Sequence, residues 1–518
     1  MIAYFREYWP GLLILTFSLF IGFMVYQDYG MSMDEDSQRM TAFAAYDYAK
    51  GTNPDYLNWE LKDHGPGFEW VLMGVEKTLN ITKFRDIYLT RHLVTYLFFI
   101  FCMFSGYVLV YKIFNNKLLA SLALVALIFH PRLFAHGFFN PKDIPAMSAF
   151  MLSLAAARWA FVKQKWWPFF LLGLICGFGS SIRLMNMVIA APVGIFLLLD
   201  LIRSVKEGKN ILPTIGNMAA LFSGFCLLLY TSWPALWIDP VASFIEVYES
   251  LSNFKWIDYV WFQGSKILST NLPWDYIPTW FFITTPEVWI LLGLAGMILL
   301  VANYIFTPKP FLDNTPERNV VLAFICFFLS IITVIKLDAV LYDGWRHMYF
   351  IYPCFVVLMA YGINELTKYR SKKIIWAICL LQLIYLGRFF IMAHPFQHVY
   401  FNHFISHEDQ YLRRHYEMDY WGTSTKDALE WLTQNTGKEK IWVNLDHWEA
   451  SVRLNTQFIS KDLSERFETT PNLDEMDYRI EFFRVDSFRY PNKERPDLQV
   501  VREIEVLNSP IYRIVKMR

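Results

Sequence analysis

Three consecutive acids, Asp34, Glu35 and Asp36, follow directly on the first long apolar run of the chain. Charges beside an apolar segment are costly to remove from water, so these acids either stay solvated or serve a function. A carboxylate within hydrogen-bond reach of a hydroxyl group can act as a general base. The stretch MDED (33–36) is therefore the first candidate for catalysis.

Three further stretches supply cations and other polar side chains. Arginine and lysine suit a phosphate or pyrophosphate group, and arginine binds it with bidentate geometry. A carboxylate base opposite such a cluster, at the mouth of a bundle of apolar helices, indicates a lipid-phosphate donor whose tail lies between the helices. The stretches are HPRLFAHGFFNPKDIP (130–145), GSSIRLMN (179–186) and LDAVLYDGWRHMYF (337–350), and their candidate binding residues are Arg132, His136, Asn140, Lys142, Asp143, Arg183, Arg346 and His347.

The elements that must position these residues are membrane spans. The chain has 518 residues, of which 55% are hydrophobic and 18% aromatic, a composition typical of a multi-span membrane protein. A span needs about 20 mostly apolar residues. Eleven windows approach that length, near 9–28, 92–113, 117–131, 144–162, 166–181, 185–202, 211–233, 286–306, 319–335, 347–366 and 374–393.

The distribution of Lys and Arg in the short loops predicts the orientation of these spans. With the N-terminus in the cytoplasm, all four polar stretches face the opposite side, where they could share one cavity. The loops that then face the cytoplasm carry Lys117, Lys163, Lys165, Arg203, Lys206, Lys209, Arg370, Lys372 and Lys373.

Residues 394–518 change in character, because charged residues become frequent and apolar runs shorten to strand length. We expect residues 1–393 to form a transmembrane catalytic module and residues 394–518 a small extracytoplasmic α/β domain. Ser424 and Asp427 predict a capping box at the start of a short helix. Strands are predicted in KIWVNL, YRIEFFRV, LQVVREIEVL and IYRIVKM, the last two joined by a hairpin at 508–510.

Several classes of function are excluded or unsupported by the sequence. The formal net charge is zero and no basic stripe is present, so nucleic acid is not an expected partner. No Walker loop, no GxGxxG after a strand and no HExxH motif occurs. We therefore expect an activated lipid as the source of energy on the outer side.

The chain resembles the GT-C glycosyltransferases, and among them the bacterial protein-O-mannosyltransferase and aminoarabinose-transferase group (glycosyltransferase family 39 type). The resemblance rests on the acids after the first span and runs over nearly the whole chain in order. Its segments are PRLFAHGFFNPKDIP, NLPWDYIPTWFFITTP (271–286), LYDGWRHMYFIYP (341–353), HPFQHVYFN (394–402) and MDYWGTSTKDALEWL (418–432).

The resemblance implies a GT-C fold with two juxtamembrane helices in the first outer loop, which TAFAAYDYAKG and GPGFEWVLMGVEKTLN fit. It implies inverting transfer of one sugar from a polyprenyl-phosphate carrier to a hydroxyl outside a bacterial inner membrane. Asp34 matches the catalytic acid that acts as base, and Glu35 matches its neighbour in the motif. Arg183 and Arg346 are the candidates to hold the carrier phosphate.

Each candidate also has a purely structural interpretation. The acids could be a solvated helix end, and Asp143 could pair locally with Lys142 or cap the fourth span. Arg183 could close a helix break, and His64 could lie in a turn, although a site role for it is left open. Residues 419–422 more plausibly dock the C-terminal domain than contact substrate.

The main alternative function is a multi-span transporter or lipid flippase, which would place ionisable residues along mid-span and repeat its topology. A receptor-like membrane anchor for residues 394–518 is a third reading. The sugar is undetermined, and the acceptor could be a protein, a lipid-linked glycan or a wall polymer. No cofactor is indicated with certainty, and a requirement for a divalent cation is open because no metal-ligand spacing is diagnostic.

Overall fold

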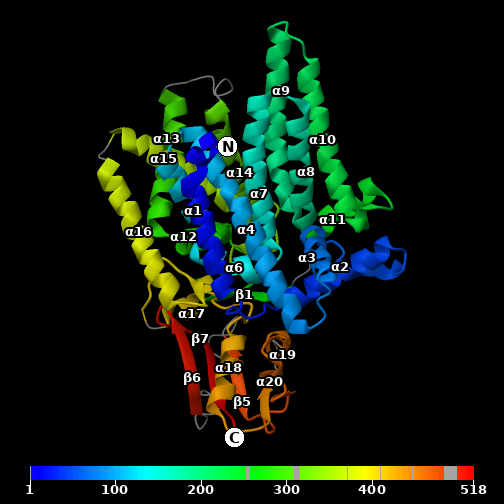
Figure 1. Ribbon diagram of the computed structural model, residues 1–518, viewed down its shortest axis with the longest axis vertical. Helices are drawn as coiled ribbons and strands as arrows, with labels where there is room; N and C mark the ends of the chain where they lie inside the picture. The colour runs from blue at the N-terminus through cyan, green and yellow to red at the C-terminus, as the bar shows by residue number, and fades with distance from the viewer. Residues whose placement is uncertain are drawn as a thin grey trace.

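The computed structural model describes residues 2–252, 257–306, 315–369, 372–408, 410–444, 449–482 and 499–518. The chain forms a long bundle of helices with a small sheet-containing part at one end, where the C-terminus lies (Figure 1). The N-terminus and the connection between α9 and α10 lie toward the opposite end. Arg370, which the orientation argument used, falls outside the described residues.

Nine helices of the described chain are long and apolar enough to cross a membrane. Their lengths of 20 to 31 residues match the thickness of a bilayer core. The chain is therefore a multi-pass membrane protein. The spans lie in α1 (Ile2–Val25), α4 (Phe84–Phe114), α7 (Asp143–Lys163), α9 (Ala190–Lys206, extended by η2, Leu184–Ile189), α10 (Leu212–Ser232), α13 (Glu287–Phe306), α14 (Thr315–Lys336), α15 (Tyr352–Tyr369, extended by η4, Arg346–Ile351) and α16 (Lys372–Met392).

The two short predicted windows also correspond to helices, so every one of the eleven windows contains a helix. Residues 166–181 form α8 (Trp166–Ile182), which has 17 residues. Residues 117–131 form α5 (Lys117–Ile128), which is followed after a bend of 56° by α6 (Pro131–Phe139). The stretch that begins at His130 was expected as an outer loop, but all nine residues of α6 are buried. Proline at its first position and its apolar content explain why this segment folds as a packed helix.

Glycines allow the spans to pack closely. A side chain at Gly173 of α8 would lie 2.2 Å from the carbonyl oxygen of Leu221 in α10, and one at Gly224 would lie 2.3 Å from that of Phe170. Gly296 of α13 meets α15 in the same way, with the carbonyl oxygen of Leu358 at 2.0 Å from such a side chain. In a bilayer, small residues that let backbones approach are a main source of helix association. These contacts hold α8 against α10 and α13 against α15.

Shorter elements cover the end of the bundle that carries the polar stretches. The two predicted juxtamembrane helices are α2 (Asp34–Ala49) and α3 (Gly67–Thr78), separated by η1 (Pro54–Asn58). Helix α2 begins seven residues earlier than the predicted segment at 41, so Asp34 is its first residue. The other elements at this end are η3 (Pro234–Leu236), α11 (Pro240–Ser252), the hairpin of β1 (Tyr259–Phe262) and β2 (Ser265–Leu268), and α12 (Tyr276–Thr284).

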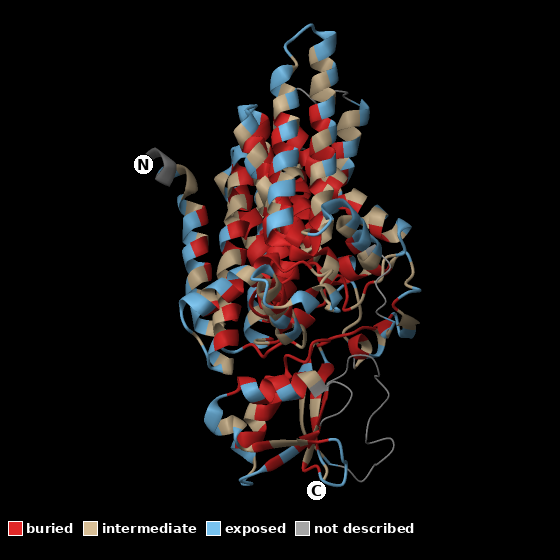
Figure 2. Ribbon diagram, turned by 90° about the vertical axis from the view of Figure 1, so that its right-hand side faces the viewer, coloured by how far each residue is buried: buried red, intermediate tan, exposed pale blue. Residues whose placement is uncertain are grey.

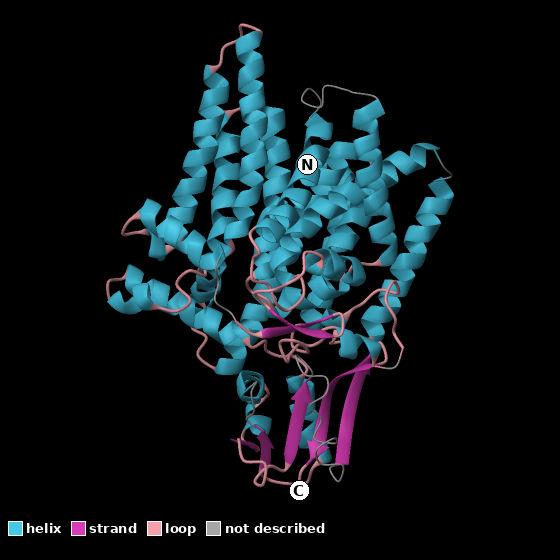
Figure 3. Ribbon diagram, turned by 180° about the vertical axis from the view of Figure 1, so that it is seen from behind, coloured by secondary structure: helices cyan, strands magenta, loops and turns pink. Residues whose placement is uncertain are grey.

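The C-terminal part contains a five-stranded mixed sheet of order β4-β3-β5-β7-β6 (Figure 3). Strands β3 (Ile441–Asn444), β4 (Phe467–Thr470) and β5 (Tyr478–Phe482) are parallel, while β6 (Gln499–Val506) and β7 (Ser509–Lys516) form an antiparallel hairpin beside β5. Its helices are α17 (Tyr411–His415), α18 (Thr425–Asn435), α19 (Glu449–Phe458) and α20 (Lys461–Ser464). The predicted α/β character is confirmed. Strand β4 was not predicted, and residues 483–485 and 498 of two predicted strands fall outside the described residues.

Two local predictions in this part need correction. Helix α18 forms as expected, but Ser424 makes no side-chain capping bond and Asp427 instead accepts hydrogen bonds from Arg502 (2.8 Å) and Tyr512. The carboxylate of Asp419 takes the capping role, since it accepts from the backbone N–H of Ser424 at 2.8 Å. The hairpin turn lies at Leu507 and Asn508, which have positive φ angles of 53° and 57°, so β7 already begins at residue 509.

Two stretches of the polypeptide between α16 and α18 contact the bundle and the hairpin beside it. The Asn402 side chain donates to the carbonyl of Thr285 at 2.7 Å, and Tyr416 forms a β-bridge with Phe262 of β1. Buried residues fill the interior of the bundle and line its contact with the C-terminal part (Figure 2). Residues 395–402 and 416–425 are almost entirely buried. The division into two domains at residue 393 remains a prediction.

Candidate active site

The three acids at the start of α2 face three different surroundings. The Asp34 side chain is 36% exposed and lies 3.4 Å from the guanidinium of Arg346. Glu35 is buried, where one of its oxygens accepts from the backbone N–H of Ser32 at 2.7 Å and the other lies 3.0 Å from His92 Nε2. The third acid, Asp36, accepts from the Tyr88 hydroxyl at 2.6 Å. Because successive residues of a helix point about 100° apart, only Asp34 reaches the centre of the site.

Arg346 is the centre of the site and touches acids from three elements. Its guanidinium lies 2.9 Å from Asp343, 3.3 Å from Asp143 and 3.4 Å from Asp34. Only 2% of its side chain is exposed. A buried charge of this kind is stable only when paired and hydrogen-bonded, which the three carboxylates provide.

Asp143 links this cluster to the next polar stretch. It is the first residue of α7, and its oxygens bind Arg346 and the Nε of Arg183. The Asn140 side chain caps the helix, since its oxygen accepts from the N–H of Asp143 at 2.8 Å and its amide donates to the Asp143 carboxylate at 3.0 Å. Capping is thus done by Asn140, while Lys142 Nζ donates to the carbonyl of Gly65 at 3.3 Å.

A hydrogen-bonded chain continues from Asn140 into the C-terminal part. The Asn140 amide also reaches Nδ1 of His136 at 3.1 Å, and Nε2 of His136 lies 3.0 Å from the Tyr420 hydroxyl. Because the Asn140 oxygen already accepts backbone N–H groups, its nitrogen must be the donor to Nδ1. The neutral His136 ring then carries its proton on Nε2 and donates it to Tyr420.

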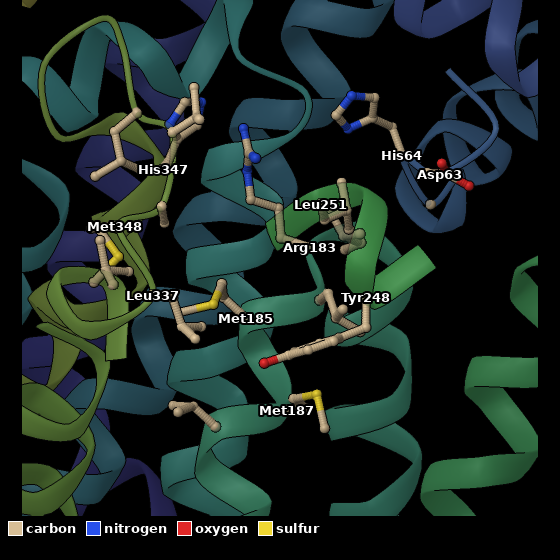
Figure 4. Close-up of a pocket in the computed structure, with 18 of the residues that line it drawn as sticks. Asp63, His64, Arg183, Met185, Met187, Tyr248, Leu251, Leu337, His347 and Met348 are labelled. Atoms are coloured by element: carbon tan, nitrogen blue, oxygen red, sulfur yellow. The ribbon is translucent and has the colours of Figure 1, made fainter. Parts of the chain in front are cut away.

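A pocket of about 240 Å³ lies beside this cluster. Its polar end is formed by Asp63, His64, Lys142, Arg183 and His347, and Figure 4 shows the Arg183 guanidinium between the imidazoles of His347 and His64. The remainder is mostly apolar and comes from η2, α11, α14 and the segment that follows α14. Its side chains include Leu184, Met185, Met187, Val188, Tyr248, Leu251, Val334, Leu337, Val340, Leu341 and Met348.

Glycines bring the polar end of the pocket together. A side chain at Gly65 would lie 2.1 Å from the carbonyl oxygen of Ser181, and one at Gly67 would lie 2.2 Å from its hydroxyl. Ser181 is the second-last residue of α8, which ends just before Arg183. The loop that carries His64 can therefore lie directly against the end of α8.

Burial and repulsion between neighbouring cations lower the pKa values of basic groups at the polar end of the pocket. Burial and the nearby charge of Arg183 lower the pKa of Lys142 to about 7, against the opposing effect of the acids Glu69, Asp143 and Asp34. Burial, followed by the charges of Lys142 and Arg183, holds the pKa of His64 well below its usual value. An anion bound between these groups would favour their protonated forms.

The structure brings together most of the candidate residues. Asp34, Asp143, Arg183 and Arg346 form one ion-pair cluster, Asn140 and His136 adjoin it, and His64, Lys142 and His347 line the pocket. Two candidates lie elsewhere. Glu35 faces His92, and Arg132 donates to the carbonyl of Tyr400 at 2.8 Å between the rings of Trp280 and Phe401.

Asp343 and Tyr342 were not among the residues predicted from the sequence, and Trp421 was expected only to help dock the C-terminal domain. The rings of Tyr342 and Trp421 each lie 4.8 Å from the Arg346 guanidinium. A local signal existed for Asp343, because an acid three residues before an arginine within an Asp-Gly turn is placed to pair with it. Asp343 and Gly344 do have positive φ angles of 59° and 68°. No local signal pointed to the contact of Trp421 with Arg346, because the two residues are distant in sequence.

A metal site does not emerge from the residues of the described ranges. No group of three or more His, Cys, Asp or Glu side chains there could hold a metal ion. The three carboxylates that do converge, Asp34, Asp143 and Asp343, surround the guanidinium of Arg346. The requirement for a divalent cation stays an open question.

No protein-family model matches the sequence, and no curated protein sequence matches it either. The fold does match solved structures. The apo oligosaccharyltransferase of Archaeoglobus fulgidus aligns with a TM-score of 0.50 and 11% identity, over 93% of this chain and 70% of that one. ArnT from Cupriavidus metallidurans aligns with a TM-score of 0.47 and 9% identity, over 97% of both chains. The first likeness shows that the chain has the GT-C fold.

Proposed function

We propose that this GT-C chain is a membrane glycosyltransferase that transfers a single hexosyl or pentosyl unit from a polyprenyl-phosphate carrier to a hydroxyl acceptor. One observation carries the proposal. A pocket with a cationic end and a long apolar remainder lies beside a carboxylate that is accessible to solvent. A lipid phosphate has matching chemistry at both ends.

The cationic end of the pocket binds the carrier phosphate. Arg183 supplies a guanidinium, and Lys142 supplies a point charge that the anion keeps protonated. His64 and His347 add ring nitrogens to the same end. The methionines, leucines and valines of the remainder accept the first isoprene units of the carrier, and the rest of its chain lies in the bilayer.

In this proposal Arg346 positions acids and does not hold the carrier phosphate, because its nitrogens lie among carboxylates. Tyr342 lines the pocket and packs on Arg346, which does not line it and whose nitrogens contact Asp34, Asp143 and Asp343. Arg346 therefore orients Asp34, while Asp143 contacts both Arg183 and Arg346 and holds the two guanidinium groups in place.

The reaction is an inverting displacement at the sugar carbon. Asp34 removes the proton of the acceptor hydroxyl, whose oxygen forms the new bond to the sugar. The bond between the sugar carbon and the phosphate oxygen breaks, and the negative charge of the released phosphate is stabilised by Arg183 and Lys142. In the transition state the sugar ring carries positive charge and resembles an oxocarbenium ion.

In this proposal the chain lies in a bacterial inner membrane, and the end of the bundle that carries the site faces the extracytoplasmic side. The acceptor is a protein, a lipid-linked glycan or a wall polymer. The fold is shared with an oligosaccharyltransferase, which supports transfer of a sugar unit to an acceptor.

The donor class is tested with purified protein in nanodiscs. Polyprenyl-phosphate sugars and the corresponding nucleotide sugars are offered separately with a cell-envelope extract, and release of the carrier is followed by mass spectrometry. We expect release from the lipid donors only. Met187→Trp fills the apolar part of the pocket and should weaken donor use, while Met24→Trp on the exposed face of α1, where Met24 is 66% exposed, should not.

Release from none of the lipid donors by stable wild-type protein would overturn the proposal and favour the transporter reading. Equal activity of Met187→Trp and Met24→Trp would remove this pocket as the donor site.

A further inference from the structure

A segment of the C-terminal part, residues 418–425, reaches into the candidate active site. The ring of Trp421 lies 4.8 Å from the Arg346 guanidinium, on which the ring of Tyr342 also packs at 4.8 Å. Trp421 is 2% exposed. A guanidinium held by two aromatic rings loses most of its rotational freedom, which fixes the direction of its N–H groups.

The segment is itself held rigidly. The Asp419 carboxylate accepts from the N–H groups of Thr423 (3.2 Å) and Ser424 (2.8 Å), and His398 Nε2 lies 3.1 Å from it. Gly422 occupies a turn with a φ of 64°. A tight turn anchored at both ends can position the two aromatic residues that it carries, Tyr420 and Trp421.

We propose that Trp421 and Tyr420 are positioning residues of the active site, supplied by the C-terminal part of the chain. The proposal rests on the function proposed above. Trp421 holds Arg346 in the orientation that reaches Asp34 and Asp143. Tyr420 accepts from His136 Nε2, which sets the His136 ring for the Asn140 amide and, through it, the Asp143 carboxylate.

The C-terminal part thereby has a role in the reaction beyond attachment to the bundle. Neither aromatic residue needs to contact the sugar or the acceptor. Each acts through a neighbour, so its loss should slow the reaction while the cationic end of the pocket, formed by Arg183, Lys142, His64 and His347, still binds the carrier.

The test compares Trp421→Leu and Trp421→Phe with a matched control in the full-length protein. Trp431→Leu is the control. Trp431 lies in α18, outside the site, and its ring is 5.3 Å from the guanidinium of another arginine, Arg502. Three readouts are taken: kcat for carrier release, the dissociation constant for polyprenyl phosphate, and the rate of phenylglyoxal labelling of Arg346 mapped by mass spectrometry.

We expect Trp421→Leu to lower kcat by about tenfold and to raise the labelling rate of Arg346 by a similar factor. The dissociation constant should stay within about twofold of wild type, and Trp421→Phe should restore most of kcat. Trp431→Leu should leave kcat and Arg346 labelling unchanged. Tyr420→Phe should lower kcat with Arg346 labelling unchanged, because it acts on the Asp143 side.

Unchanged Arg346 labelling in a folded Trp421→Leu variant would overturn the inference. So would a parallel loss of kcat and carrier binding in Trp421→Leu and Trp431→Leu, which would indicate a purely structural role. The labelling readout needs no turnover, so an inactive wild type would contradict the proposed function while increased labelling would still support the positioning of Arg346.

Discussion

At the scale of single residues, the site is an arrangement of one buried arginine among acids that come from distant parts of the sequence. Arg346 binds Asp343 within its own turn, Asp143 at the start of α7 and Asp34 at the start of α2. Asp34 is the most exposed of the three carboxylates, with Asp143 and Asp343 each 1% exposed. Exposure therefore distinguishes the residue that can meet an acceptor from those that hold the site.

The neighbouring acid Glu35 is predicted to support stability. Glu35→Gln replaces the buried carboxylate that lies 3.0 Å from His92 Nε2 and should lower the free energy of unfolding by about 1–3 kcal/mol. Thermal unfolding in detergent checks this. The control is Glu60→Gln, which changes an exposed acid between η1 and α3. A variant that melts like wild type but no longer releases carrier would instead assign Glu35 a direct part in the reaction.

Donor binding should depend on pH through Lys142, whose pKa near 7 leaves it protonated below that pH and neutral above it. An anion binds the protonated form, so affinity for the donor should fall as the pH rises above about 7, by up to about tenfold per unit. A phosphodiester donor has no titrating proton in this range, so the change reports the protein. Lys142→Arg, which stays charged, should bind with little pH dependence; the same slope in this variant would contradict the assignment.

The sequence alone identified seven residues of the ion-pair cluster and pocket end, because four polar stretches alternate with apolar spans and must meet on one side. The sequence could not show which of Asp34 and Glu35 faces the site, since both acids follow the same span. The orientation of α2 decides this, and it depends on the hydrogen bond between Ser32 and Glu35. Arg132 was a reasonable candidate by charge, but its place between Trp280 and Phe401 is set by tertiary packing.

At the scale of elements, loops and helix ends build the pocket where spans terminate. The spans themselves were predictable, because long apolar runs leave few alternatives in a bilayer. The buried helix α6 and the parallel strand β4 were not, since both depend on partners that are remote in sequence. The capping box predicted for α18 is wrong because Asp427 accepts hydrogen bonds from Arg502 and Tyr512, which are also remote in sequence.

The contact between the loop that carries Gly65 and the end of α8 predicts that a side chain at Gly65 weakens donor binding. Gly65→Ala places a methyl group 2.1 Å from the carbonyl oxygen of Ser181, and should displace His64 from Arg183 at a cost of about 1–3 kcal/mol in donor binding. Gly74→Ala in α3 meets nothing within 4 Å and is the matched control. Isothermal titration with polyprenyl phosphate measures both. Equal affinity of the two variants would show that this contact does not shape the pocket.

At the scale of the whole molecule, the site lies between the bundle and the C-terminal part, so both contribute to it. Residues 395–402 and 416–425 are buried at this junction, and the sheet lies beyond them (Figures 1 and 3). The division predicted from composition at residue 393 follows the end of the last span. Composition could not show that residues 395–402 and 416–425 are buried at this junction, because their burial depends on contacts such as Asn402 with Thr285.

The orientation of the chain is a prediction that reporter fusions test. Lysines and arginines of the loops opposite the site should face the cytoplasm. Alkaline phosphatase, which is active only outside the cytoplasm, should be active when fused after Arg518 and inactive when inserted at Gly208 between α9 and α10. Reversed activities would place the site on the cytoplasmic face and exclude the proposed localisation.

The most direct test of the central claim compares two acids of the same helix. Asp34→Asn removes the proposed base, whereas Asp36→Asn changes an acid that binds Tyr88 outside the site. Carrier release is measured with a donor that wild type uses, after both variants are shown to be folded and to bind polyprenyl phosphate. We expect Asp34→Asn to lose at least about 100-fold in rate and Asp36→Asn to stay within a few-fold of wild type. Undiminished release by Asp34→Asn would contradict the role of Asp34 as base.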